Sequence, residues 1–328
     1  MGHYRLGSRD GNSDFPFIFP SFSLHLPLER TSDWQLNWLA LSVTQSGQPT
    51  MKRRSFIKTV AAASAVTALP STSTAGEFTG VIKKAVKFQN VNEPKLSILD
   101  KFKLLQDLGF DGTELRSSYA DQKNEYIRAT EKTGLPIHGL VNSSGPDIAG
   151  AIDFCSAVGG SAILVTAPYD KKKPFMDSWR GRMEIIRKGL PAAEKHGVKI
   201  LVENVWAGFL ISAFDTARFI DEVDNPWFGS YFDVGNNVRW GVPEHWIDIL
   251  GKRIGKLDIK EWDERLHRDT GLRSGFKSKL GEGTINWGNV RKSLKKIGYS
   301  GWATAEVGGG DRAWLKDLAA RMDKILDL

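Results

Sequence analysis

Sulfur and histidine are scarce in this sequence. The chain has 328 residues but one cysteine, Cys155, so an internal disulfide is excluded and no disulfide framework can organise the fold. Cys155 lies in an apolar helical pattern, and we interpret it as a small buried hydrophobic residue. Only four of the six histidines fall in residues 76–328, which leaves few imidazole ligands for a zinc site.

Long apolar runs and a strong charge bias are also missing. Residues 76–328 contain no stretch of 18 uncharged apolar residues, so they predict no membrane-spanning helix and no stable membrane association. The net charge is +7, but residues 1–75 hold seven Lys/Arg and four Asp/Glu, which leaves 38 against 34 for the remainder. That mild, scattered excess predicts a solvated basic surface and no nucleic-acid partner. A hydrophobic content of 41% excludes a disordered chain.

Residues 51–75 have the composition of an export signal. Met51 opens a basic segment that contains Arg53 and Arg54, an uncharged Ala-rich run follows, and small residues end the segment. This order describes a secretory signal, and the arginine pair resembles the twin-arginine signal, which carries folded proteins. We therefore expect an exported, periplasmic protein. A signal that begins at Met51 leaves residues 1–50 as a disordered upstream extension, outside the fold.

The remaining residues, 76–328, alternate strand and helix patterns. Short apolar runs bounded by turn residues predict buried parallel strands. The expected strands are Ala85–Asn90, Gly112–Ser117, Pro136–Asn142, Ala162–Ala167, Lys199–Trp206, Phe228–Asn236, Ile254–Asp263 and Trp302–Val307. Several helical patterns between them stop at a glycine, the usual residue just past a helix end. The expected helices include Ser97–Leu108, Asp147–Val158, Phe175–His196, Ser212–Val223, Glu244–Leu250, Ile285–Ile297 and Arg312–Leu328.

This alternation favours a TIM barrel over a doubly wound open sheet. Strand–helix units repeated eight times over about 250 residues are typical of a single-domain (β/α)8 TIM barrel. The alternative is a doubly wound open sheet, in which a Gly-rich phosphate turn would follow the first strand. The sequence there, Lys87–Asn92, contains no glycine. We therefore expect residues 76–328 to form a TIM barrel that does not bind a dinucleotide.

Acidic residues lie towards the C-terminal ends of the last four expected strands. An acid at such a buried position is costly unless something compensates its charge, and in TIM barrels the chemistry lies at the C-terminal strand ends. The four acids are Glu203, Asp233, Asp258 and Glu306. Carboxylate oxygens are hard ligands, so the set predicts a site for one divalent metal ion, Mn²⁺ or Mg²⁺. Strand alternation predicts which other residues share the barrel interior: Lys256 and Lys260 with Asp258, and Trp302 and Thr304 with Glu306.

The segments around these acids resemble a known family, the xylose-isomerase-like barrels of sugar isomerases and epimerases. The resemblance spans about Ala85 to Leu328 and rests on these segments: Val202–Asn204, Phe232–Asn236, Lys256–Glu261, Gly281–Gly283 with Asn286–Trp287, and Thr304–Glu306. It implies that one divalent metal is held at the ends of strands 5 to 8. Glu203, Asp233 and Glu306 match the family's ligands residue for residue, whereas the family's histidine falls on Asp258. That departure adds a negative charge and favours a hard ion over Zn²⁺.

The resemblance also implies the chemistry. Glu203 and Glu306 would double as the acid/base pair that moves a proton next to a sugar carbonyl through an enediolate. Where some family epimerases have a histidine, this chain has Asn236, and the arginine expected after strand 7 has only an approximate counterpart in Arg265.

Other polar and aromatic residues are candidates for contact with a sugar. They are His138, Glu114, Lys260, Asn236 and Trp206. For His138 the alternative is a hydrogen-bonded core histidine, and for Glu114 it is an ion pair with Lys87 or Arg116. Lys260 either donates to a sugar oxygen or neutralises the acids. Trp206 either stacks on a sugar face or packs the barrel.

We therefore expect an enzyme, a metal-dependent sugar isomerase or epimerase acting on a small carbohydrate. Export favours a sugar or keto sugar without phosphate, because sugar phosphates are cytoplasmic. One alternative is a lyase or hydratase of 3-keto-glycosides that uses the same metal-enediolate chemistry, and another is a non-catalytic sugar-binding barrel. A related barrel endonuclease would need more histidines at its strand ends than this chain offers. The sequence is compatible with a homo-oligomer.

Overall fold

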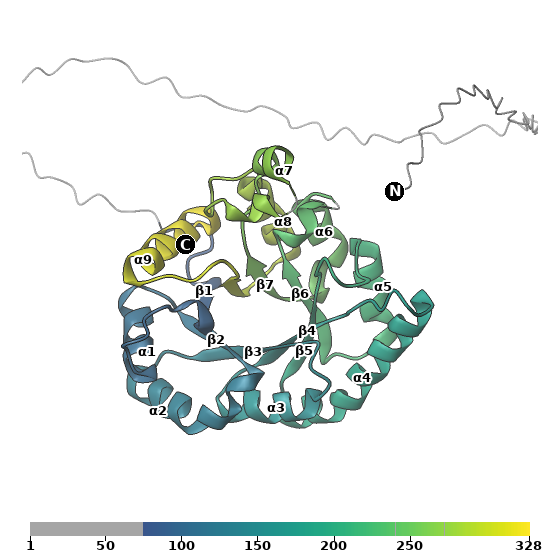
Figure 1. Ribbon diagram of the computed structural model, residues 1–328, viewed down its shortest axis with the longest axis horizontal. Coiled ribbons are helices and arrows are strands. Elements are labelled where there is room, and N and C mark those ends of the chain that lie inside the picture. Colours follow the sequence, from purple (N-terminus) through teal and green to yellow (C-terminus); the bar gives the residue numbers. More distant parts are fainter. Residues whose placement is uncertain (1–74, 240, 272) are drawn as a thin grey trace, which may run out of the picture. The chain divides into compact units, whose positions relative to one another are not determined.

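The chain folds into a closed barrel of eight parallel strands (Figure 1). A computed structural model describes residues 75–239, 241–271 and 273–328. Each strand pairs with the next along the chain, and the last pairs with the first, so the predicted TIM barrel is confirmed. The strands are β1 (Ile82–Lys87), β2 (Gly112–Arg116), β3 (Ile137–Ser143), β4 (Ala162–Thr166), β5 (Lys199–Glu203), β6 (Phe228–Asp233), β7 (Ile254–Ile259) and β8 (Gly301–Ala305).

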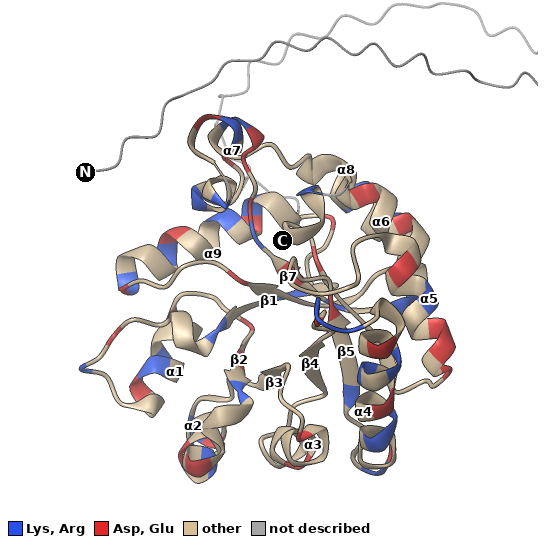
Figure 2. Cartoon of the chain, turned by 45° about the vertical axis from the view of Figure 1, so that its right-hand side comes forward, with Lys and Arg blue, Asp and Glu red and all other residues tan. Residues whose placement is uncertain are grey.

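Helices form a ring outside the strands (Figure 1). They are α1 (Ile98–Asp107), α2 (Lys123–Thr133), α3 (Ile148–Ala157), α4 (Phe175–His196), α5 (Ala213–Val223), α6 (Pro243–Leu250), α7 (Glu264–Thr270), α8 (Trp287–Ile297) and α9 (Arg312–Leu326). Short 3-10 helices add η1 (Phe88–Asn90), η2 (Ser117–Gln122), η3 (Asn236–Arg239), η4 (Gly251–Arg253) and η5 (Ser274–Lys277). Basic and acidic residues alternate over the outer helices, as expected for a solvated surface (Figure 2).

Local sequence explains where these helices begin and end. Ser212 and Asp215 form a capping box at the start of α5, in which each side chain accepts a hydrogen bond from the other residue's backbone amide. Ser97 caps α1 in the simpler way, by accepting from the amide of Asp100. At the other ends, Gly134 and Gly298 adopt the left-handed conformation that closes α2 and α8. These signals are local, which is why the sequence revealed them.

Two apolar regions hold the barrel together. The larger one lies between the strands and the helical ring and includes Cys155, which is fully buried as expected. The smaller one fills the inside of the barrel with Ala162, Leu164, Leu201 and Tyr231. The rest of the barrel interior is polar, because Lys87, Glu114, His138, Lys256, Asp258 and Thr304 are all buried there. That polar content is costly unless its members pair with one another.

Several expected boundaries are wrong. The expected fifth, sixth and seventh strands run past their observed ends at Glu203, Asp233 and Ile259. Beyond Asp233 the chain turns into η3, because the carboxylate accepts hydrogen bonds from the backbone amides two and three residues ahead. Helix α7 and η5 lie in the segment between β7 and α8, for which no element was expected.

The proposed export signal and the upstream extension lie, except for residue 75, outside the described residues. Among the helices of residues 75–328 that the structure describes, none is long and apolar enough to cross a membrane.

Candidate metal and active site

The four acids of the last four strands lie together at one end of the barrel. Each offers a carboxylate oxygen, and these oxygens all lie within 4.8 Å of one another. Three of the side chains are buried, whereas the Glu306 side chain is 32% exposed and opens the group to solvent. We call Glu203, Asp233, Asp258 and Glu306 the carboxylate cluster.

Neighbouring polar groups fix the first two acids of the carboxylate cluster. Asp233 accepts hydrogen bonds on Oδ1 from the backbone amides of Gly235 and Asn236, both at 2.8 Å. The Asn204 amide side chain spans β5 and β6, donating to the Asp233 carbonyl at 3.0 Å and accepting from its amide at 2.8 Å. The Asn236 side chain donates to Glu203 Oε1 at 3.0 Å. These bonds hold Glu203 and Asp233 in one orientation relative to each other.

Two lysine amines enter the carboxylate cluster. Lys87, at the end of β1, places Nζ 2.8 Å from Asp258 Oδ2 and 3.2 Å from Glu306 Oε1. Lys260, just after β7, places Nζ 2.8 Å from Asp233 Oδ2 and 2.5 Å from Glu306 Oε2. Glu306 therefore lies between both amines. Because Lys87 and Asp258 are both buried, that pair lies in a low-dielectric setting where Coulomb forces are strong, whereas Glu306 is partly exposed.

The residues present fit a divalent metal ion. Four carboxylates against two amines leave two uncompensated negative charges when all are ionised. Asp258 Oδ1 is buried and has no hydrogen-bond partner among the described residues. An all-oxygen donor set with such an orphaned atom is the kind that Mg²⁺ or Mn²⁺ prefers. A doubly charged ion would bring the net charge of the group to zero.

Burial and mutual repulsion separate the acidities of the four carboxylates. Burial, followed by the nearby charges of Glu306 and Asp258, raises the pKa of Glu203 well above its usual value. Burial also raises the pKa of Asp258 well above its usual value, and it raises that of Asp233 to about 6, in each case against the attraction of a lysine. Burial acts on Glu306 in the same direction, but Lys87 and Lys260 together lower its pKa. Glu306 is thus the carboxylate that most readily stays ionised.

A cavity of about 440 Å³ opens above the carboxylate cluster. We call it the barrel-mouth cavity. Of the sequence-predicted residues, Glu203, Glu306, Lys260, Asn236 and Trp206 line it. Trp206 is half-buried, and its indole donates to the Asn236 carbonyl at 2.8 Å. The cavity therefore combines the two glutamates with an amine, an amide and an aromatic ring, a combination suited to a small polyhydroxylated ligand.

Two of the predicted sugar contacts lie deeper in the barrel. Glu114 is fully buried and accepts a hydrogen bond from the Tyr231 hydroxyl at 3.1 Å. His138 contacts Lys256 Nζ through Nδ1 and the Thr304 hydroxyl through Nε2, both at 3.0 Å. Neither is among the residues that line the barrel-mouth cavity. Both therefore belong to a polar layer beneath the carboxylate cluster. This position agrees with the alternatives considered for them, a hydrogen-bonded core histidine for His138 and an ion pair for Glu114.

The expected strand alternation is confirmed. Lys256 reaches His138 inside the barrel, and Lys260 reaches the carboxylate cluster two residues after Asp258. On β8, Thr304 hydrogen-bonds to Tyr231 at 3.0 Å, and Trp302 stacks on His138 with ring centroids 4.5 Å apart. The period of two along each strand is a local property, so the sequence was sufficient to predict it.

Sequence reasoning missed other residues of the site. Lys87 was considered only as a partner of Glu114, from which its amine lies 3.8 Å, whereas its closest contacts are with Asp258 and Glu306. The available signal was a charged residue at the end of the first apolar strand. Arg273 and Phe276 line the barrel-mouth cavity from η5 and the turn before it. Arg265, the approximate counterpart of a family arginine, instead pairs with Asp263 at 2.7 Å outside the cavity.

Comparison with known proteins agrees with this architecture. The sequence profile of the family described as Xylose isomerase-like TIM barrel matches residues 102–325. An uncharacterized protein, MJ1311, of Methanocaldococcus jannaschii is 31% identical over 118 residues, which cover 35% of this chain and only 38% of that protein.

Solved structures share the fold at low sequence identity. A 3-keto-D-glucoside 4-epimerase, YcjR, from E. coli superposes with a TM-score of 0.62 at 17% identity over 74% of this chain and 98% of its own. A D-psicose 3-epimerase from Clostridium cellulolyticum H10, solved with D-tagatose, gives 0.60 at 18% identity over 75% and 100%. The IOLI protein, solved with a zinc atom, gives 0.61 at 15% identity over 74% and 98%.

Proposed function

This chain belongs to the xylose isomerase-like TIM barrel family, and from that premise we propose that it is a metal-dependent sugar isomerase or epimerase. Its reaction would move a proton at a carbon next to a sugar carbonyl. The similar fold of two sugar epimerases supports a sugar substrate. The observation that carries the proposal is the pair Glu203 and Glu306, whose carboxylates line one cavity and belong to one cluster of four acids.

The two glutamates are suited to opposite roles. Lys87 and Lys260 keep the Glu306 carboxylate ionised, so it can accept a proton from the sugar carbon. Glu203 lines the same cavity from the end of β5, whereas Glu306 follows β8, so Glu203 can return a proton to the other face of the intermediate. Return to the same carbon on the opposite face inverts it, whereas return to the neighbouring carbon exchanges aldose and ketose.

The remaining groups position the sugar and its charge. A divalent ion held by Glu203, Asp233, Asp258 and Glu306 would polarise the carbonyl and stabilise the negative charge that develops on its oxygen. Lys260 is 15% exposed on the cavity and can donate to a sugar oxygen. The half-buried indole of Trp206 offers an apolar face to the ring carbons. Asn236 orients Glu203 through its 3.0 Å hydrogen bond.

Solvent deuterium exchange tests this proposal directly. Metal-loaded protein in D₂O is expected to place deuterium on a carbon next to the carbonyl of a keto sugar, with D-fructose, D-tagatose and D-psicose as first probes and NMR as the readout. Both E203Q and E306Q should slow exchange by roughly 10²–10⁴-fold, the usual contribution of a general acid or base. E131Q, at an exposed site on α2, is the matched control and should exchange at the rate of the unaltered protein.

The other outcomes separate the alternatives. Full metal occupancy without exchange in any aldose, ketose or keto-glycoside would contradict the proton-transfer proposal. Release of an aglycone from a 3-keto-glycoside would assign the same site to a lyase instead. Sugar binding without deuterium exchange and without aglycone release would support the remaining alternative, a non-catalytic sugar-binding barrel.

Export is a further part of the proposal, carried by the sequence of residues 51–75. An exported enzyme would meet sugars without phosphate groups. Replacing Arg53 and Arg54 together by lysine should retain the protein in the cytoplasm, and cell fractionation measures this. Equal periplasmic amounts of both forms would contradict a twin-arginine route.

A further inference from the structure

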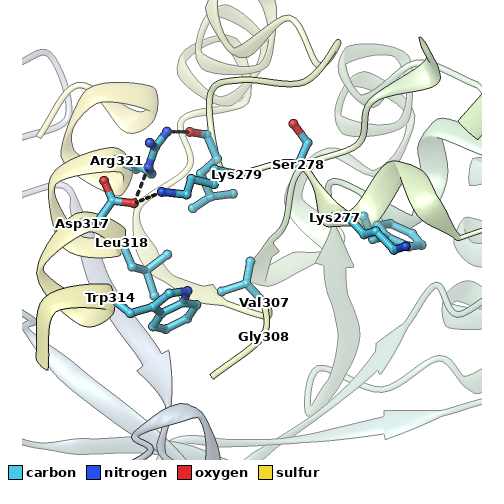
Figure 3. Close-up of a pocket in the computed structure, with 11 residues that line it drawn as sticks. Lys277, Ser278, Lys279, Val307, Gly308, Trp314, Asp317, Leu318 and Arg321 are labelled. Carbon is cyan, nitrogen blue, oxygen red and sulfur yellow. Dashed lines mark hydrogen bonds and ion pairs between the residues drawn. The ribbon is translucent and has the colours of Figure 1, made fainter. Parts of the chain in front are cut away.

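A second cavity of about 320 Å³ lies beside the barrel-mouth cavity (Figure 3). The segment from η5 to Leu280 forms one side of it, α9 forms another, and Val307 and Gly308 after β8 form the base. Its volume falls at the lower end of the roughly 300–1,000 Å³ typical of small-molecule sites. We call it the α9 cavity.

The two cavities adjoin. Phe276, Val307 and Gly308 line both of them. Val307 and Gly308 directly follow Glu306, so the α9 cavity begins one residue beyond the proposed base. A β-carbon placed at Gly308 would meet no atom within 4 Å, which shows that the chain leaves open space at this shared wall. The two cavities are therefore neighbours, with open space at Gly308, a residue that both share.

Trp314 gives the α9 cavity a fixed aromatic surface (Figure 3). The ring packs directly against Gly310, where a β-carbon would overlap its Cγ atom. The backbone amide of Trp314 donates to the capping residue Asp311 at 3.0 Å, which ties the residue to the first turn of α9. The side chain stays half-buried. A partly exposed, immobilised indole is a platform on which the apolar face of a sugar ring can stack.

Three cationic side chains line the α9 cavity: Lys279 and Arg321, which pair with acids, and Lys277. Asp317 Oδ2 accepts from Lys279 at 3.2 Å and from Arg321 at 2.8 Å (Figure 3). Arg321 also pairs with Glu282 at 2.7 Å. These ion pairs offset the positive charge of Lys279 and Arg321, which would otherwise favour an anion such as phosphate. Asp317 Oδ1 has no hydrogen bond among those found in the described residues, and it and the Ser278 hydroxyl can bond to sugar hydroxyls.

We propose that the α9 cavity binds the second ring of a two-ring carbohydrate whose first ring lies at the carboxylate cluster. The proposal rests on the proposed function, since it extends the substrate of that site from a single sugar to a disaccharide. The aromatic ring of Trp314 favours a sugar ring, and the Asp317 carboxylate, which would repel a phosphate group, favours a neutral, hydroxyl-rich ligand.

Calorimetric titration of the metal-loaded full-length protein tests this proposal without depending on turnover. The probes are cellobiose and maltose, which carry a second glucose ring in two linkages, with glucose as the single-ring probe and phenyl β-D-glucoside as the aromatic one. At least one disaccharide should bind about tenfold more tightly than glucose. W314A should remove that difference, W314F should keep most of it, and F214A, which removes an exposed aromatic ring from α5, should leave it intact.

A second variant tests the connection without touching Trp314. In G308V the added side chain would enter the open space at a residue that lines both cavities, so the preference for the disaccharide should fall while the melting temperature stays unchanged. Equal affinity for glucose and both disaccharides, or a preference that survives both W314A and G308V, would overturn the proposal. Tighter binding of phenyl β-D-glucoside than of either disaccharide would also overturn it, in favour of an aromatic group.

The experiments can refute either proposal without refuting the other. Deuterium exchange in single-ring sugars together with equal affinity for one and two rings would refute only the second-ring site. Disaccharide binding through Trp314 without exchange in any sugar would refute only the isomerase or epimerase reaction.

Discussion

Replacing Lys87 is the most direct test of how the negative charge of the carboxylate cluster is compensated. Its amine is buried and contacts Asp258 at 2.8 Å and Glu306 at 3.2 Å. Burial disfavours the charge, but these carboxylates raise the pKa of Lys87 well above its usual value, so it is a cation at neutral pH. Replacing it by methionine keeps much of the volume and removes the charge.

The expected cost is large because the acids remain buried. Removing one partner of a buried ion pair costs about 3–5 kcal/mol. For a barrel of this size that corresponds to a fall of roughly 6–20 °C in melting temperature. The loss should be largest in metal-free K87M, since a divalent ion replaces part of the missing positive charge. Adding Mn²⁺ should therefore raise the melting temperature of K87M by more than that of the unaltered protein.

Thermal unfolding with and without EDTA and Mn²⁺ measures both effects. K83M, at an exposed position of the same strand, is the matched control and should change the melting temperature little. K87R keeps the charge and should recover part of the lost stability. Two results would refute the reasoning: metal-free K87M as stable as K83M, or a Mn²⁺ response no larger in K87M than in the unaltered protein.

Two further predictions concern the neighbourhood of the site. In G235A the new methyl group would overlap Cγ of Lys260 and displace its amine from Asp233 and Glu306, so we expect slower deuterium exchange. The control is G181A, on the outer helix α4, where space is open. Burial lowers the pKa of His138 well below 6.5, so the unfolded chain binds the proton first and stability should fall as the pH drops below about 6.5. Urea unfolding at pH 7.5 and 5.0 should show a smaller loss for H138N than for the unaltered protein, and equal losses would contradict this origin.

The fold was predictable because its signals are local and repeated. Short apolar runs bounded by turn residues, helical patterns and the glycines that end them recur along residues 76–328, and each reports on its own neighbourhood. The position of an acid at a strand end is equally local. A closed parallel barrel then gathers all such ends at one rim, so the proximity of the four acids follows from the architecture.

The residues that surround those acids were harder to predict from the sequence. Lys87 lies 171 residues before Asp258 in the sequence, and only barrel closure between β1 and β8 brings it into the carboxylate cluster. His138 and Glu114 lie on strands that also end at the rim, but their depth depends on how far each strand is staggered against its neighbours. Residue patterns do not specify that stagger, which is why both were candidates for sugar contact.

The amino-acid sequence by itself determined the eight strand–helix units and the acidic residue towards the C-terminal end of each of the last four strands, because both follow from side-chain periodicity and turn chemistry. Tertiary structure alone decided that Lys87 and Lys260 share Glu306, and that the α9 cavity opens beside the barrel-mouth cavity. Those features depend on contacts between segments far apart in the chain, and such contacts exist only once the barrel has closed.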